Sequence, residues 1–154
     1  MFKIGMLTDY GILILTHMAK NPQGWSSAAE LSASLNLPKP TVAKVLKLMN
    51  HHGLLDSHRG KQGGYRLSRS PGRISITEIL EAIEGPLHVT DCALPHASCQ
   101  RIIQCDLPAH WRVVNEVIHS AIKEISLDFF CQSKPCGLVG YLARTSPSST
   151  PNPS

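Results

Sequence analysis

Three cysteines lie close together in a segment with no regular periodicity, and they are the residues of this 154-residue chain best suited to metal chemistry. They are spaced as Cys92-x6-Cys99-x5-Cys105. Thiolates are the usual ligands of iron–sulfur clusters, and three of them in an irregular loop can close around one. Structural zinc sites instead pair cysteines roughly two to four residues apart. The spacing therefore favours an iron–sulfur site, and zinc, a thiol switch and plain reduced cysteines stay open as alternatives.

Other thiols and imidazoles give a weaker signal. Cys131 and Cys136 are interpreted as incidental thiols rather than as a second redox pair. His96 falls between two loop cysteines and His110 lies five residues beyond Cys105, so both are candidate metal ligands. The sequence contains no nucleophile–base arrangement, phosphate-binding loop or dinucleotide fingerprint, so we expect that the chain is not an enzyme.

Basic side chains form the second group with a clear chemical use. Residues 36–73 hold eight Lys or Arg against one acid, Asp56, whereas the whole chain carries a net charge of only +4. A basic block inside a patterned segment indicates a polyanionic partner such as nucleic acid.

The elements around this basic block predict a winged helix. A short helix begins at Ser27, which forms a capping box with Glu30. A second helix runs from about Pro40 to His51, and Gly53 ends it. Two short helices joined by a tight turn are typical of a helix-turn-helix. Strand candidates at 54–55 and 65–67 flank a basic, glycine-rich hairpin tip, which would be the wing.

In such a domain the second helix lies in the major groove of DNA and neighbouring elements touch phosphates. Arg59 stands beside glycines that allow close backbone approach, which suits insertion into the minor groove. The sequence therefore predicts double-stranded DNA as the partner and a contact surface made of Lys39, Pro40, Thr41, Lys44, Lys47, Arg59, Lys61, Gly63 and Gly64.

The remaining elements are helical, so the predicted fold is mainly α. One helix over 7–20 is expected to open at Thr8-Asp9, and another begins at Ser75. A long helix over 108–130 carries an apolar stripe, which indicates a partner helix from a second copy of the chain. The stripe comprises Trp111, Val114, Ile118, Ala121, Ile125 and Phe129.

These elements divide the chain into four parts. They are a winged-helix DNA-binding domain (1–85), a cluster-binding loop (86–107), a dimerisation helix (108–130) and a largely disordered tail (131–154). No apolar run approaches the ~18 residues that span a bilayer, and the N-terminus lacks a signal-peptide pattern. We therefore expect no membrane association, a cytoplasmic location and reduced cysteines.

Three motifs occur together in this chain and resemble those of one family. They are Thr8-Asp9-Tyr10-Gly11, the wing residues Ser57-His58-Arg59-Gly60 with Gly63-Gly64-Tyr65, and Ala82-Ile83-Glu84-Gly85-Pro86. The family is that of bacterial winged-helix regulators of the IscR type, which control iron–sulfur cluster assembly, and of the NsrR type, which sense nitric oxide. The resemblance covers about residues 1–130 and is strongest to regulators of the SUF cluster-assembly operon.

The resemblance implies a homodimer, a palindromic operator and an iron–sulfur cluster on Cys92, Cys99 and Cys105, with [2Fe–2S] preferred over [4Fe–4S]. IscR-type proteins have a histidine three residues after the third cysteine, where this chain has Pro108. NsrR-type proteins instead use an aspartate from the other subunit, and Asp9 occupies that position.

Asp9 is therefore the first candidate for the fourth ligand. His110 is the second candidate, followed by His96, Asp106 or an exogenous ligand. IscR-type recognition helices also carry a glutamate where this chain has Ala43. The base preference of that type is therefore not transferred to this chain.

Taken together, these features predict a cytoplasmic, homodimeric, iron–sulfur-dependent transcriptional regulator, specifically a repressor of SUF cluster-assembly genes. The alternative is a protein that carries iron–sulfur clusters or metal on the same cysteines without specific DNA binding. Such a protein would not need the basic wing, and its DNA binding would depend only weakly on salt.

Overall fold

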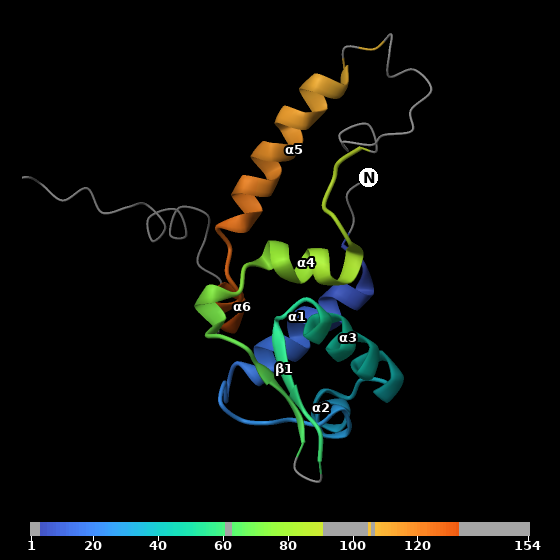
Figure 1. The fold of residues 1–154 in the computed structure, drawn as a ribbon, viewed down its shortest axis with the longest axis vertical. Coiled ribbons are helices and arrows are strands. Elements are labelled where there is room, and N and C mark those ends of the chain that lie inside the picture. The colour runs from blue at the N-terminus through green and yellow to red at the C-terminus, as the bar shows by residue number, and fades with distance from the viewer. Residues whose placement is uncertain (1–3, 61–62, 91–104, 106, 133–154) are drawn as a thin grey trace, which may run out of the picture.

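The computed structural model describes residues 4–60, 63–90, 105 and 107–132 (Figure 1). Helices dominate this part of the chain, and a two-stranded antiparallel hairpin is inserted among them, as predicted. No helix within the described ranges is long and apolar enough to cross a bilayer. The elements are α1 (Met6–Met18), α2 (Ala28–Leu35), α3 (Lys39–His51), β1 (Leu55–His58), β2 (Gly64–Leu67), the 3-10 turn η1 (Pro71–Arg73), α4 (Ile76–Glu84), α5 (Leu107–Lys123) and α6 (Leu127–Cys131).

Local capping signals place the ends of α2 and α3 where the sequence predicts them. Ser27 Oγ accepts from the Glu30 N–H at 3.2 Å, and the Ser27 N–H donates to Glu30 Oε2 at 2.7 Å. Helix α3 begins at Lys39, one residue before the predicted start at Pro40. It ends before Gly53, whose φ of +71° strongly favours glycine. The helix-turn-helix is thus confirmed.

The core of the domain forms where α1, α3 and α4 meet. The four buried side chains of α3 are those predicted from helical spacing: Val42, Val45, Leu46 and Met49. They join buried leucines and isoleucines of α1 and α4 in one cluster. At Gly11 a Cβ would lie 2.5 Å from the Ile83 side chain, so a glycine at this position permits the close packing of α1 on α4.

The wing is the β1–β2 hairpin together with a short segment from the α1–α2 connection. Leu55 pairs with Leu67 and His58 with Gly64 in the hairpin register. Ser26 adds to the other side of β2 through two backbone hydrogen bonds with Tyr65, both 2.9 Å long. A Cβ on Gly64 would lie 2.6 Å from the Ser26 carbonyl oxygen, so only glycine fits there without a shift of the backbone.

The predicted single helix over 108–130 is wrong in its C-terminal part. Helix α5 ends at Lys123, and a separate short helix, α6, starts at Leu127. Between the two helices the backbone is extended and forms an antiparallel bridge that joins Ser126 to Ser75.

Hydrogen bonds to the start of α4 explain this break. The Ile76 N–H donates to the Ile125 carbonyl at 2.7 Å, and the Leu127 N–H donates to the Ile74 carbonyl at 2.8 Å. The Leu127 side chain is fully buried in the core. These non-local contacts replace the hydrogen bonds that a continuous helix would have made.

The break also changes the orientation of the predicted apolar stripe. Ile125 packs against the core of its own chain, and so does Ile122, which the predicted stripe did not include. Ile118 lines a small cavity with Leu87 and Val89. The apolar side chains that α5 leaves exposed include Val114 of the predicted stripe together with Leu107, Val113 and Val117, of which Val113 and Val117 lie on another side of the helix.

Candidate DNA-binding surface and metal ligands

The solvent side of α3 presents a basic, acid-free surface. Lys39, Pro40, Lys44 and Lys47 are exposed, and Thr41 is half-buried. The opposite side of the helix is held in the core, so the predicted contact residues lie together on the solvent side.

The wing tip adds a further basic residue, Arg59, beside glycines, as predicted. Arg59 is exposed, and the next residue, Gly60, has φ of +134°. The Gly63 N–H donates to the Gly60 carbonyl at 3.0 Å and closes the turn. A side chain at position 63 would collide with the His58 carbonyl. The predicted contact Lys61 lies outside the described residues.

Ion pairs within the described residues leave the basic surface uncompensated. Arg66 Nη2 lies 3.2 Å from Asp56 Oδ2, and Arg69 Nη2 lies 2.6 Å from Glu78 Oε1. None of the ion pairs between described residues involves the lysines of α3 or Arg59. The positive charges of the α3 lysines and of Arg59 therefore stay available to a polyanion.

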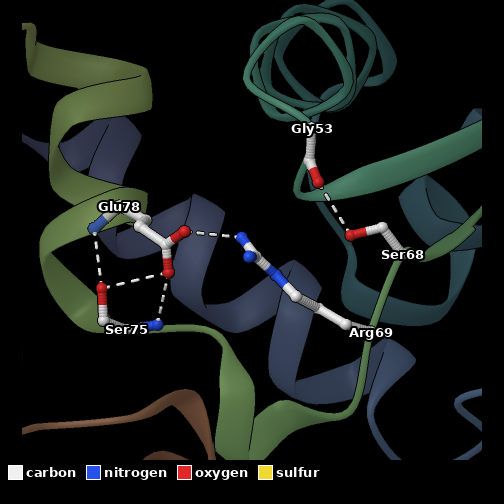
Figure 2. A network of polar contacts seen from close by, with 5 residues as sticks. All are labelled: Gly53, Ser68, Arg69, Ser75 and Glu78. Carbon is white, nitrogen blue, oxygen red and sulfur yellow. Dashed lines mark hydrogen bonds and ion pairs between the residues drawn. The ribbon is translucent and has the colours of Figure 1, made fainter.

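A polar network fixes the strand that leaves the wing (Figure 2). Ser68 Oγ donates to the Gly53 carbonyl at 2.7 Å, just after α3. The guanidinium of the neighbouring Arg69 donates a hydrogen bond to the Glu78 carboxylate, which also accepts from the Ser75 N–H at 2.9 Å. Burial alone would raise the pKa of Glu78, but the Ser75 N–H and the Arg69 guanidinium together hold that pKa below its ordinary value.

A group on the outer face of the wing was missed by sequence reasoning. Trp25, from the segment before α2, has its ring 5.8 Å from the ring of His58. Cζ of Arg66 lies 4.8 Å from the Trp25 ring centroid. Trp25 belongs to no periodic segment, so nothing in the local pattern placed it beside the hairpin.

The structure describes one of the three predicted cluster cysteines. Cys105 is a half-buried free thiol two residues before α5 begins. Cys92 and Cys99 lie outside the described residues, as do the alternative ligands His96 and Asp106. Within the described ranges, no three His, Cys, Asp or Glu residues are grouped as a metal site. The predicted ligand set therefore stays a prediction.

Asp9 is exposed on the first turns of α1, but the predicted helix start at Thr8-Asp9 is wrong. The helix begins at Met6, and its N-terminus is capped by a distant carboxylate. Glu84 Oε1, at the end of α4, accepts from the Gly5 N–H at 3.1 Å and from Thr8 Oγ1 at 2.5 Å. The Thr8 side chain is fully buried, so its hydroxyl points inward while the Asp9 side chain is left to solvent.

The candidate ligand His110 lies on α5, and the incidental thiol Cys131 lies on α6. His110 is exposed near the start of α5. Cys131 is an exposed free thiol at the end of α6. Partial burial, with a contribution from Asp128, raises the pKa of the Cys131 thiol. A raised pKa lowers the fraction of reactive thiolate, which agrees with its interpretation as an incidental thiol.

Comparison with known families finds one matching family. The model of the Rrf2 family, described as iron-dependent transcriptional regulators, matches residues 5–133. The HTH-type transcriptional regulator IscR of Xenorhabdus nematophila is 29% identical over 120 residues, which cover 77% of this chain and 73% of that protein. An HTH-type regulator of Synechocystis sp. is 31% identical over 86 residues, or 55% of this chain and 58% of its own length.

Solved structures share the fold at low sequence identity. IscR of T. potens has a TM-score of 0.61 and 22% identity, and the match covers 91% of this chain and 97% of that one. CymR of B. subtilis, a global cysteine regulator, has a TM-score of 0.63 and 23% identity, with 85% and 97% coverage. These matches confirm the winged-helix fold. Because one of the matched proteins is named a cysteine regulator, the fold alone does not identify the signal to which this chain responds.

Proposed function

Because the chain belongs to the Rrf2 family of transcriptional regulators, we propose that it is a cytoplasmic homodimer whose operator binding depends on an iron–sulfur cluster, and that it represses SUF cluster-assembly genes. One observation carries the DNA-binding part of this proposal. The exposed lysines of α3 and Arg59 of the wing form a basic surface that no acid compensates within the described residues. A carrier of clusters or metal would have no use for such a surface.

The two parts of this surface have different expected roles. The lysines of α3 are suited to phosphates, which set affinity and register, whereas Arg59 can enter the minor groove. Arg59→Ala should therefore weaken operator binding by about 1–3 kcal/mol, and Lys61→Ala should cost less and mainly flatten the salt dependence. Titration of a labelled operator duplex at several salt concentrations measures both effects. Small and equal losses for the two variants would show that Arg59 does not read the groove.

The exposed side of α5 supports the homodimer. Figure 1 shows α5 projecting from the end of the molecule opposite to the hairpin tip, and of the elements its principal neighbour is α4. Val113 and Val117 on this projecting part are 60% and 64% exposed. A helix with exposed apolar side chains is stabilised when it packs on the same helix of a second copy.

The donor chemistry supports an iron–sulfur cluster. Three cysteines, of which Cys105 is described as a free thiol, provide the thiolates that iron prefers, and the exposed carboxylate of Asp9 can supply a fourth ligand. When bound, such a cluster supplies a redox-sensitive centre. Cys105 would hold it next to the start of α5, so cluster binding would act on the helix that we expect to form the dimer.

The placement of α5 supports Asp9 as a ligand contributed by the second subunit. His119 Nε2 lies 3.1 Å from Glu81 Oε1, which fixes α5 against α4 one turn before Glu84. The start of α5 lies twelve residues before His119, or roughly 18 Å further along the helix. Asp9 follows Thr8, whose hydroxyl donates to Glu84 Oε1 at the end of α4. Most of the length of α5 therefore separates Cys105 from the His119–Glu81 contact, and this favours Asp9 of the partner subunit over Asp9 of the same chain as the fourth ligand.

Substitution of the candidate ligands tests the cluster part of the proposal. In protein purified without oxygen, Asp9→Ala should change the absorbance spectrum and lower the iron content, whereas His110→Ala should not. Cysteine substitutions at 92, 99 and 105 should each abolish the cluster, and those at 131 and 136 should leave it intact. Retention of a wild-type cluster by Asp9→Ala, with loss in His110→Ala, would reverse the ranking of the two ligands.

A further inference from the structure

The outer face of the wing carries four polar or aromatic side chains in contact with one another. Arg66 and Asp56 occupy paired positions on β2 and β1. Trp25 adds its indole from the Ser26 side of the sheet and touches both Arg66 and His58. We call Trp25, Asp56, His58 and Arg66 the wing platform.

The guanidinium of Arg66 is held in place from two directions. Its Nε and Nη2 both donate to Asp56 Oδ2, at 3.3 and 3.2 Å, and its Cζ lies 4.8 Å from the centroid of the Trp25 ring. Neither of these two hydrogen bonds uses Nη1. Trp25 is 40% exposed, so part of its ring is also available to a ligand.

The platform lies at the end of the molecule that faces DNA in a winged helix. Trp25 is followed by Ser26, which pairs with β2, and then by Ser27, the N-cap of α2. His58 directly precedes Arg59 at the wing tip. Figure 1 shows α2 and the hairpin tip at the same end of the molecule, opposite to α5. The platform therefore lies between two elements that approach the DNA backbone.

We propose that Trp25 and Arg66 form an additional binding site for the sugar–phosphate backbone of duplex DNA, beside the groove that Arg59 enters. This inference rests on the proposed DNA-binding function. The Trp25 ring would contact the sugars, and Nη1 of Arg66 would donate to a phosphate oxygen. Because the aromatic ring and Asp56 already order the guanidinium, Arg66 loses less conformational freedom on binding than a solvated arginine does.

The fluorescence of Trp25 tests the location of the site. The chain contains two tryptophans, so Trp111→Phe leaves Trp25 as the single emitter. Duplex DNA is taken from a random-sequence pool by selection with the wild-type protein. Saturation with this duplex should quench or shift the Trp25 emission. An unchanged emission at saturation would overturn the proposal.

Affinity measurements test the contribution of the site against a matched control. Arg66→Gln and Trp25→Leu should each weaken binding of the selected duplex about tenfold, and Arg66→Gln should reduce the slope of log K against log salt by about one. The control is Arg73→Gln, which removes the same charge from η1, an exposed turn that packs on α6. It should lose less than threefold. Thermal unfolding of all three variants verifies that the fold is retained.

The outcomes separate this inference from the proposed function. If Arg59→Ala loses binding but Arg66→Gln and Trp25→Leu behave like the Arg73 control, DNA binding stands and the wing platform is wrong. Equal losses for Arg66→Gln and Arg73→Gln would also overturn it, because the effect would then be one of overall charge. If the wild-type protein selects no duplex, both the function and the platform are wrong.

Discussion

Glu78 connects the exit of the wing to the start of α4 through three interactions, and its charge has a measurable effect on stability. The pKa of its carboxyl is lowered in the folded chain, since the Ser75 N–H and Arg69 together outweigh the opposing effect of burial. The resulting stabilisation is present above the unfolded pKa of about 4.3 and is lost as the pH falls through the lower folded pKa. Glu78→Gln isolates this charge, because glutamine can preserve the capping box.

We therefore expect Glu78→Gln to lower the free energy of unfolding at pH 7 by less than about 1 kcal/mol, because the ion pair is partly exposed. At pH 3, below the unfolded pKa, the difference between the wild-type protein and the variant should be smaller than at pH 7. Urea unfolding at pH 7 and at pH 3 measures the difference in the free energy of unfolding between the two proteins at each pH. A difference of the same size at pH 3 would mean that packing, and not charge, is what the substitution removes.

Glu84 shows which residues a sequence can and cannot assign. The basic residues of α3 and Arg59 were predicted because helical spacing and turn glycines are local signals. The contact of Glu84 with Gly5 and Thr8 joins residues more than 70 positions apart, and no local pattern reports it. The wing platform was missed for the same reason, since Trp25 and Arg66 meet only in the folded chain.

The ends of the helices and strands also divide into those set by local sequence signals and those set by contacts between distant residues. The capping boxes of α2 and α4 and the glycine after α3 set their ends correctly from sequence. The apolar spacing of residues 108–130 is compatible with one helix, but pairing with the start of α4 breaks it after Lys123. Ser26 likewise joins the wing because of β2 and not because of its own neighbours.

Gly64 gives a test of this added strand. Gly64→Ala would place a Cβ 2.6 Å from the Ser26 carbonyl oxygen, and a backbone atom cannot move aside cheaply. The substitution should lower the free energy of unfolding by about 1–3 kcal/mol. Gly72→Ala is the matched control, because nothing lies within 4 Å of the added Cβ, and it should change stability by less than about 0.5 kcal/mol. Equal stability of the two variants in urea would show that the Ser26 contact yields to a side chain.

The described part of the molecule buries most apolar side chains of its DNA-binding domain in one core but leaves Val113, Val114 and Val117 of α5 exposed. Because Ile118 packs within its own chain, Val117 is the better site for a test of the dimer. Val117→Glu should dissociate the dimer, since burial of an unpaired carboxylate is costly. Arg112→Glu places the same side chain about 140° away around the helix and should leave the dimer intact. Sedimentation equilibrium distinguishes the outcomes, and a dimer that tolerates glutamate at 117 would place the interface elsewhere.

The Ser75–Ser126 bridge and the His119–Glu81 contact hold only the C-terminal part of α5, and this makes the rest of the helix a lever. The part of α5 from Leu107 to His119 extends roughly 18 Å from that contact, so a tilt of about 10° would move its free end by roughly 3 Å. Ser75 also caps α4, so the pivot belongs to the same rigid unit as the recognition helix. Any event that shifts the free ends of two paired levers would therefore rotate the two DNA-reading units relative to each other. A displacement of a few ångströms between them is enough to take one recognition helix out of register with its half-site.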